Sequence, residues 1–336
     1  MNQHDGLFRS QRFASAVALA ALFTCSLLLG MADASAQTWP TKPIKLLVGF
    51  PAGGASDVMA RLVADRLGQA LGQTIIVDNR PGAAGTLAAS TAARSAPDGY
   101  TLLLASPTAI TLAPSTMADR IQYNPAKDLV PVTQVARYPL FLIANPALGV
   151  KNVPEFLQRA RREPGKINFA SFGLNTSGGL ATEMVKLLAK VDLTHVPFNG
   201  SAPAIQALLG GHVDLMFDTA VTALPLIKSG KVVVLAISSA QRTSLAKDLP
   251  TFAETVPGFE ADSWVGLMAP AGTSTEFVVR LQREVAKFVA SADVQERFSA
   301  LGADAVASTP QDFAQFLHDE TARYARLVKE ANLKLE

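Results

Sequence analysis

The chain has 336 residues, 30 of them basic and 28 acidic, which leaves a formal net charge of +2 at pH 7. Its lysines and arginines are dispersed, and the densest group, at 159–162, fits a solvated helix face, so a nucleic-acid-binding surface is excluded. A single cysteine, Cys25, excludes an internal disulfide framework.

The first residues have the three-part pattern of a cleaved secretory signal. Arg9 and Arg12 precede an apolar run at 13–31, and the small triplet Ala-Ser-Ala ends at Ala36. We therefore predict a signal peptide over 1–36, cleaved after Ala36; the alternative is an uncleaved anchor, since the run is nearly long enough to span a bilayer. Cys25 lies inside the run, so the mature chain would carry no thiolate nucleophile. About 300 residues would remain, more than one small core usually organises, which favours two lobes.

The mature part alternates strand-like apolar runs with segments whose apolar residues recur every three or four positions. Strands are predicted at 44–50, 74–77, 100–105, 140–144, 167–170, 195–196, 213–217, 232–237 and 264–269. Helices are predicted at 58–71, 86–94, 154–163, 180–190, 202–209, 275–291 and 311–332. This alternation predicts parallel β-α-β units and an α/β fold with covered sheet faces. Crossings between lobes are expected around 134–137 and 259–262, so that 37–137 plus 263–336 would form lobe 1 and 138–262 lobe 2.

Three loops rich in glycine or small residues stand between strands and helices, at 51–56, 173–179 and 198–201. Such a loop exposes backbone N–H groups, and the helix N-terminus behind it adds partial positive charge, so an anion can be held without a basic residue. In open α/β sheets these sites lie beyond the carboxyl ends of the strands. The alternative is plain turn chemistry, in which glycine supplies a positive φ and nothing binds.

Two aspartates stand at the same kind of position. Ser56 and Asp57 occupy the place of a helix N-cap, and capping is one interpretation of Asp57. Because a carboxylate would repel an anionic ligand, the other interpretation is that Asp57 receives an amino or hydroxyl group. Asp218 follows the apolar strand at 213–217 and allows the same two interpretations.

Enzyme motifs for acyl transfer, phosphate loops, dinucleotide binding and zinc proteolysis do not occur in the sequence. His195, His212 and His318 are far apart and lack metal-ligand spacing, so each is expected to be a core or surface residue, with no metal and no cofactor. Ser177, beside two glycines, is the one candidate nucleophile. A secreted serine hydrolase of the α/β class would need a histidine and a carboxylate converging on it.

Sequence motifs spread over nearly the whole mature chain resemble those of one receptor family. The motifs are WPTKPI at 39–44, VGFPAGGASD at 48–57, DNRPGAAG at 78–85, PDGYTLL at 97–103, VPFNG at 196–200, GHVD at 211–214 and GLMAPAGT at 266–273. In this order they resemble the Bug-type receptors, the periplasmic component of tripartite tricarboxylate transporters.

The resemblance implies an α/β, two-lobed periplasmic binding protein fold of type II, each lobe a mixed sheet flanked by helices, with the ligand in the cleft between the lobes. It implies a small carboxylate held by loop amides and hydroxyls without a salt bridge, and a monomer of the Gram-negative periplasm that serves the membrane subunits of a transporter or a sensor protein. The implied ligand contacts are Phe50, Ala52, Gly53, Ser56, Asp57 and Thr108 in lobe 1, and Thr176, Ser177, Phe198, Asn199, Gly200 and Asp218 in lobe 2.

The sequence departs from the family pattern at Ser106-Pro107-Thr108-Ala109, where a glycine or serine followed by a small residue is more usual. Pro107 removes one amide donor from that loop. The leading hypothesis is a receptor that performs no chemistry on its ligand. The serine hydrolase is the alternative, and a purely structural exported protein is the third.

Overall fold

The structure is a computed structural model that describes residues 39–243 and 246–330. From Lys42 onward the chain forms one compact unit. The predicted signal peptide at 1–36 and Cys25 lie outside the described residues. None of the described helices is both long enough and apolar enough to cross a membrane.

A mixed, six-stranded sheet forms the first lobe. Its strands are β1 (Ile44–Val48), β2 (Ile75–Asn79), β3 (Thr101–Ala105), β4 (Leu129–Tyr138), β10 (Ser263–Pro270) and β11 (Asp304–Ala305). They lie in the order β11-β4-β10-β3-β1-β2. β1 is parallel to β2 and β3, whereas β10 is antiparallel to β3 and β4. The carboxyl ends of β1, β2 and β3 therefore meet at one edge of this sheet.

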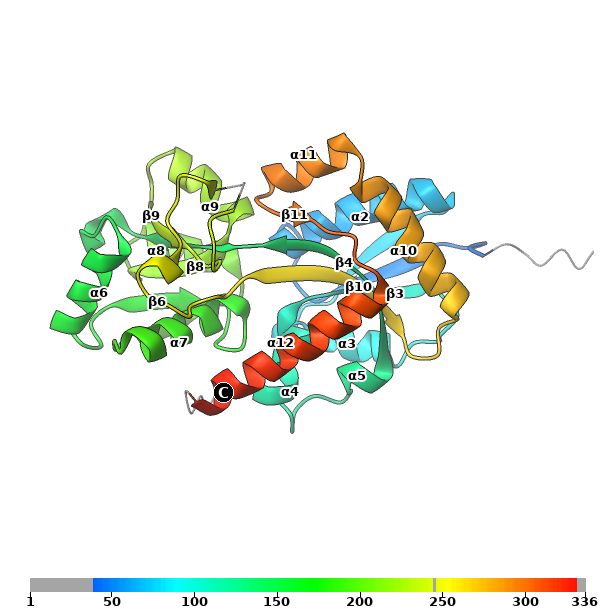
Figure 1. Ribbon diagram of the computed structural model, residues 1–336, viewed down its shortest axis with the longest axis horizontal. Helices are drawn as coiled ribbons and strands as arrows, with labels where there is room; N and C mark the ends of the chain where they lie inside the picture. The colour runs from blue at the N-terminus through cyan, green and yellow to red at the C-terminus, as the bar shows by residue number, and fades with distance from the viewer. Residues whose placement is uncertain (1–38, 244–245, 331–336) are drawn as a thin grey trace, which may run out of the picture. The chain divides into compact units, whose positions relative to one another are not determined.

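Helices cover both faces of the six-stranded sheet. They are α2 (Ala55–Leu71), α3 (Thr86–Ala93), α4 (Ala113–Thr116), α5 (Pro125–Asp128), α10 (Thr275–Val289), α11 (Ala292–Ala300) and α12 (Pro310–Glu330). Figure 1 shows α2 and α10 on one face and α3 and α12 on the other. The apolar residues of α2 that recur at three-and-four spacing, Met59, Leu62, Val63 and Leu67, are buried, as an amphipathic helix requires. On the opposite face the Trp264 indole packs edge-on against Phe313 of α12, with ring centroids 5.5 Å apart.

Short turns complete the first lobe. They are η1 (Ala83–Gly85), a single 3₁₀ turn, and η2 (Thr108–Leu112), a π-helical turn that follows β3. Two further 3₁₀ turns, η3 (Pro146–Leu148) and η5 (Phe252–Glu254), belong to the middle of the chain.

A mixed, five-stranded sheet forms the second lobe. Its strands are β5 (Leu140–Ala144), β6 (Asn168–Ser171), β7 (Thr194–Pro197), β8 (Leu215–Thr219) and β9 (Val233–Ile237), in the order β7-β6-β8-β5-β9. β6 is parallel to β7 and β8, and β5 is antiparallel to β8 and β9. The carboxyl ends of β6, β7, β8 and β9 therefore lie at the same edge.

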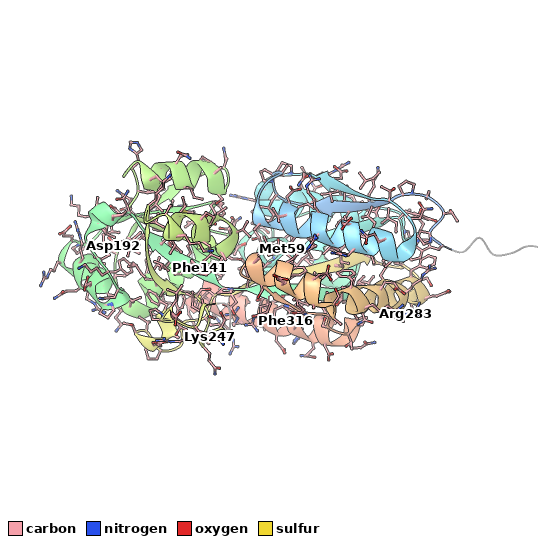
Figure 2. The ribbon with its side chains drawn as sticks, turned by 90° about the horizontal axis from the view of Figure 1, so that it is seen from above. Met59, Phe141, Asp192, Lys247, Arg283 and Phe316 are labelled. Carbon is pink, nitrogen blue, oxygen red and sulfur yellow. The ribbon has the colours of Figure 1, made fainter. Side chains whose placement is uncertain are left out.

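The helices of the second lobe are α6 (Val153–Arg162), α7 (Ser177–Ala189), α8 (Ser201–Leu209) and α9 (Ala220–Lys228). Small residues of α8 and α9 pack on Phe141 of β5, which lies inside this lobe (Figure 2). Phe217 of β8 joins Phe252 and Phe259 in a ring cluster, with its centroid 5.9 Å from that of Phe259. Each sheet therefore has an apolar core of its own.

One feature of the sequence prediction is corrected. The expected crossing around 134–137 lies inside β4, which stays paired with β10 as far as the Tyr138 and Ser263 pair, so the chain leaves the first sheet only at Pro139. The second expected crossing, 259–262, is irregular backbone between η5 and β10. Both sheets are mixed, as the family resemblance implies, because β4, β5 and β10 run against their neighbours. The lobe limits at 137 and 263 stay a prediction.

Candidate ligand-binding site

The loop after β1 lies against the loop after β2 through two glycines. A Cβ on Gly49 would lie 2.6 Å from the Cα of Gly85, so only glycine at 49 lets the two backbones approach this closely. Phe50 follows, half-buried, and Ala52 and Gly53 are exposed, with Gly53 at φ +83°. This segment delivers the chain to the N-terminus of α2.

Asp57 is turned toward its own loop. Its Oδ2 accepts 2.9 Å hydrogen bonds from the Gly53 amide and from Arg61 Nε, and its Oδ1 accepts a 3.0 Å bond from Asn79 Nδ2. The Asn79 amide also donates to the carbonyl of Phe50 at 3.0 Å. Asp57 therefore fixes the loop from inside, with the end of β2 as its support.

The helix begins earlier than the sequence indicates. Its N-cap is Gly54, in extended conformation and without a side-chain cap, so Ser56 and Asp57 lie in the first turn and not at the cap. The prediction that Ser56 or Asp57 is the N-cap is wrong, because Asp57 bonds back to the Gly53 amide from the third helical position. The N–H groups at the start of α2 have no partner within the helix.

Burial alone would raise the pKa of the Asp57 carboxyl, but the hydrogen bonds from Arg61, Gly53 and Asn79 outweigh it and hold the pKa below its ordinary value. The Arg61 guanidinium correspondingly has a raised pKa, because it donates to Asp57. The pair is an ion pair with its carboxylate buried and its guanidinium largely exposed. Asp57 therefore stays ionised and neutralised inside the loop.

Thr108 opens the π-turn η2 at the carboxyl end of β3, next to β1, and it is buried. At its start the Ile110 amide bonds to Ser106 O at 3.2 Å, which is the α-helical spacing of four residues. Thr111 in the same turn donates to the Glu320 carboxylate at 3.0 Å. π-helical turns inside proteins are frequent at functional sites.

In the second lobe, Thr176 caps α7. Its Oγ1 donates to Gly173 O at 2.7 Å and accepts from the Gly179 amide at 3.3 Å. A Cβ on Gly178 would lie 2.9 Å from Phe217 O, and one on Gly179 would lie 2.7 Å from the Cα of Leu174. Both glycines are therefore required by close packing under the loop, a reason the sequence could not show.

Ser177 lacks the surroundings of a nucleophile. In the described part of the chain its Oγ pairs with Ser263 Oγ at 3.3 Å. His195 of β7 bonds through Nε2 to Ser171 Oγ at 2.7 Å, and Ser171 Oγ also accepts from the Gly173 amide. Burial, with the charge of Lys186, lowers the pKa of His195. His195 thus supports the loop after β6 through Ser171.

Asp218, at the end of β8, holds the starts of two helices together. Its Oδ2 accepts from Ser201 Oγ at 2.8 Å and from Thr222 Oγ1 at 2.7 Å, and its Oδ1 accepts from the Thr219 amide at 2.8 Å. Ser201 begins α8 behind Gly200, which has φ +112° and provides no side-chain cap. Burial raises the pKa of the Asp218 carboxyl, against the hydrogen bonds from Thr222, Ser201 and Thr219.

Phe198 and Asn199 lie in the loop between β7 and α8. The Phe198 amide bonds to Ser171 O at 2.9 Å, which ties this loop to the one after β6. Phe198 is half-buried and Asn199 is exposed.

The twelve residues predicted from the resemblance therefore fall into two groups, one at the strand ends of each sheet. The first group follows β1 and β3, and the second follows β6, β7 and β8. Side-chain contacts join the two lobes beside them: Ser177 reaches Ser263 of β10, and Asn175 Nδ2 lies 2.9 Å from Met117 Sδ.

The sequence interpretation missed the residues that hold these loops from behind. They are Asn79, Ser171, His195, Ser201 and Thr222. Asn79 lies inside the motif at 78–85 and Ser201 is the last residue of the loop at 198–201, and polar residues at strand ends are a signal that could have found them. Over residues 39–243 and 246–330, no group of three or more His, Cys, Asp or Glu could hold a metal ion.

Two mixed α/β sheets, each with its own core and helices, joined by crossing segments and with glycine loops at their strand ends, define a two-lobed periplasmic binding protein. The sequence model described as "Tripartite tricarboxylate transporter family receptor" matches residues 59–333. The chain belongs to this receptor family. The fold and the family predicted from the motifs are confirmed, and the protein is a solute-binding receptor.

Named relatives and solved structures agree with this assignment. Protein BugT of Bordetella pertussis is 38% identical over 306 residues, covering 91% of this chain and 94% of its own. Rpa4515 of R. palustris, solved with adipate, is 36% identical with a TM-score of 0.83, covering 88% of this chain and 98% of its own. MatC of Rhodopseudomonas palustris, solved with bound malate, is 34% identical with a TM-score of 0.79, covering 86% of this chain and 100% of its own.

Proposed function

We propose that this receptor binds a small carboxylate between its two lobes in the periplasm and delivers it, unchanged, to the membrane subunits of a tripartite tricarboxylate transporter or to a sensor. The protein would reach that compartment through the signal peptide at 1–36, cleaved after Ala36, and would act as a monomer.

The observation that carries the proposal is that the carboxylates of Asp57 and Asp218 both accept hydrogen bonds from groups of their own lobe. The oxygens of Asp57 accept hydrogen bonds from Gly53, Arg61 and Asn79. Those of Asp218 accept hydrogen bonds from Ser201, Thr219 and Thr222. What the loops have left to offer a ligand are backbone N–H groups and hydroxyls. Such donors, backed by helix N-termini, favour an anion.

The helix caps support the same conclusion. At α6 the Asn152 side chain accepts the Glu155 amide at 2.9 Å and so occupies the helix N-terminus. At α2 and α8 the caps are Gly54 and Gly200, which have no side chain to do so. The first-turn amides of α2, and those of Ser201 and Ala202 in α8, where Pro203 has none, are therefore available to a carboxylate.

The proposed contacts are those implied by the family resemblance: Phe50, Ala52, Gly53, Ser56, Asp57 and Thr108 in the first lobe, and Thr176, Ser177, Phe198, Asn199, Gly200 and Asp218 in the second. We assign Asp57 and Asp218 the task of holding the loops in place. The adipate bound to Rpa4515 and the malate bound to MatC support a dicarboxylate as the ligand class.

We further propose that no chemistry takes place on the ligand, since Ser177 pairs with Ser263 and His195 pairs with Ser171. Ser177→Ala removes one of the proposed contacts, so it should reduce the ligand-induced rise in melting temperature, and neither wild type nor the variant should convert the ligand. A purified protein that hydrolysed ester substrates, and lost that activity in Ser177→Ala, would establish the hydrolase instead.

The direct test is a thermal-shift and calorimetric screen of the protein purified from the periplasm. The panel contains adipate, malate, glutamate and citrate, with adipamide as the uncharged match for adipate. At least one carboxylate should raise the melting temperature with concentration, because a ligand at 100 times its Kd stabilises the native state by about 2.7 kcal/mol. No response to any carboxylate, or an equal response to adipamide, would contradict the proposal.

A further inference from the structure

A buried carboxylate outside the ligand loops joins three elements of the first lobe. Glu320 of α12 is 6% exposed. Its Oε2 accepts hydrogen bonds from the indole N–H of Trp264 and from Thr111 Oγ1, the latter at 3.0 Å. Its Oε1 lies 3.4 Å from Arg323 Nη2. The carboxylate therefore connects α12, β10 and the π-turn η2.

The contact with Thr111 reaches the ligand site, because Thr111 belongs to the same turn as Thr108. Thr111 Oγ1 lies 3.0 Å from both Glu320 Oε2 and Pro107 O, yet a hydroxyl has one proton to donate. The charged oxygen is the stronger acceptor. Glu320 therefore competes with the backbone of the turn for this proton and sets the conformation of the segment that carries Thr108.

Arg323 extends the connection to a crossing segment. Its Nη1 donates to the carbonyl of Glu260 at 2.9 Å, inside the irregular stretch 259–262. The Glu260 side chain in turn accepts from Arg137 Nη2 at 2.8 Å, and Arg137 lies near the end of β4, where the chain leaves the first sheet. Glu320 is thus two contacts away from one connection between the lobes and three contacts away from the other.

The path continues into the second lobe. Arg137 Nε lies 3.3 Å from Asp262 Oδ2, and Ser238 Oγ lies 3.4 Å from Asp262 Oδ1. Ser238 Oγ also accepts the Leu140 amide at 2.8 Å, next to the first residues of β5. Polar contacts therefore run from the π-turn through α12 to the start of the second sheet.

An apolar contact runs parallel to this path. Leu112 of the π-turn, Tyr324 of α12 and Leu180 of α7 form a buried cluster. Leu180 lies four positions after Thr176, and its amide closes the first turn of α7 on Thr176 O at 2.9 Å. The same stretch of α12 therefore touches the ligand-loop supports of both lobes.

We propose that Glu320 is a positioning residue for ligand binding: it sets the π-turn that carries Thr108 and, through Arg323, couples that turn to the segments on which the lobes move. The inference rests on the proposed function and adds a residue that touches no ligand. Hinge closure needs a few positions that absorb the movement, and Glu320 is connected to such a position through Arg323, which also bonds to the segment at 259–262. A purely apolar contact would serve stability as well or better.

The test is Glu320→Gln, which keeps the shape and one acceptor for Trp264 but removes the charge seen by Thr111 and Arg323. Glu284→Gln is the matched control: Glu284 is 9% exposed on α10, with Lys287 Nζ at 3.0 Å and Arg283 Nε at 3.3 Å. We expect Glu320→Gln to weaken the affinity for the best carboxylate of the panel about tenfold, and Glu284→Gln to leave it within about twofold. Equal affinities in the two variants overturn the inference.

Thr111→Val tests the same contact from its other side, and it remains informative if the Glu320→Gln variant does not fold. Its control is Thr116→Val, which removes a hydroxyl whose partner among the described residues is Leu112 O, at 3.1 Å. Thr111→Val should weaken binding several-fold and Thr116→Val should not. In the double variant that combines Glu320→Gln with Thr111→Val, the two losses of affinity should not multiply, because both substitutions act through the contact between Glu320 and Thr111. Independent losses in the double variant, or an unchanged Kd in Thr111→Val, contradict the inference.

The outcomes separate the two proposals. A wild-type protein that binds no carboxylate removes the proposed function and this inference with it. A wild-type protein that binds, with Glu320→Gln and Thr111→Val binding equally well, removes only the role of Glu320.

Discussion

The side-chain amide of Asn79 donates a 3.0 Å hydrogen bond to the Asp57 carboxylate, so the last residue of one strand supports the helix that follows its neighbour. The same amide holds the carbonyl of Phe50. One side chain therefore fixes both ends of the loop that exposes Ala52 and Gly53.

Asn79→Ala removes both bonds and leaves Asp57 without one of its donors. Because a lost hydrogen bond costs about 1 kcal/mol and a tenfold change in affinity is 1.4 kcal/mol, we expect carboxylate affinity to fall about tenfold. The melting temperature should fall by about 2–4 °C. Isothermal titration and thermal unfolding measure the two effects. Gln69→Ala, which loses an exposed bond to Asp65 on the same lobe, is the control and should bind normally.

Asp57→Asn should change how stability depends on pH. The folded pKa of Asp57 is lowered from its ordinary value of 3.8, so its contribution is present above that value and is lost as pH falls through the lower folded pKa. The melting temperature of wild type should therefore exceed that of Asp57→Asn at neutral pH, and the difference should shrink below pH 3.8. Asp65→Asn on the exposed side of α2 is the control. A difference that stays constant down to about pH 2 would refute this account.

Gly53→Ala separates backbone strain from ligand contact. Gly53 has φ +83° and Gly258 has φ +86°, and a Cβ at either would meet nothing within 4 Å. A left-handed conformation costs an alanine about 1–2 kcal/mol, so both substitutions should lower the melting temperature alike. Affinity for a carboxylate should fall only in Gly53→Ala, since Gly258 lies in a turn outside the ligand loops. Equal affinity in both variants would show that the loop at 51–56 does not contact the ligand.

Asp218→Asn should have the opposite pH dependence to Asp57→Asn. Burial raises the pKa of Asp218, so its contribution to stability is fully present below the ordinary value of 3.8 and is lost as pH rises through the folded pKa. Asparagine cannot ionise, and its amide can donate to the rotatable hydroxyls of Ser201 and Thr222. The melting temperature of Asp218→Asn relative to wild type should therefore rise between about pH 3.5 and 7. A fall over this range in a thermal-shift series would contradict the assignment.

Much of the secondary structure could be predicted from the sequence, because apolar spacing is a local property. The strands β1, β3 and β5 and the helices α2, α3 and α6 lie within a few residues of the predicted ranges. Helix α9 was not predicted: it is short and carries Pro225 inside, which normally argues against a helix. Strand β4 was taken for a crossing because only its pairing with β10 extends it to Tyr138.

The candidate site, like the secondary structure, could be predicted only in part from the sequence. Composition alone identifies the glycine loops at 51–56, 173–179 and 198–201. Their places at strand ends follow from the β-α-β pattern. The side chains that support these loops could not be predicted, because the fold brings them together from distant parts of the sequence. Nothing near Asp57 in the sequence indicates Asn79, and nothing near Thr108 indicates Glu320, 209 positions beyond the Thr111 that it contacts.

Strand β10 lies between β3 and β4 in the six-stranded sheet, yet it follows the entire second lobe in the chain. The five strands of the second sheet are consecutive and can pair once β9 has emerged. Until β10 (Ser263–Pro270) has been synthesised, the first sheet consists of two separate parts, β3-β1-β2 and β4. Pairing between segments so distant in sequence is slow. The half of the receptor that is synthesised first is therefore completed last.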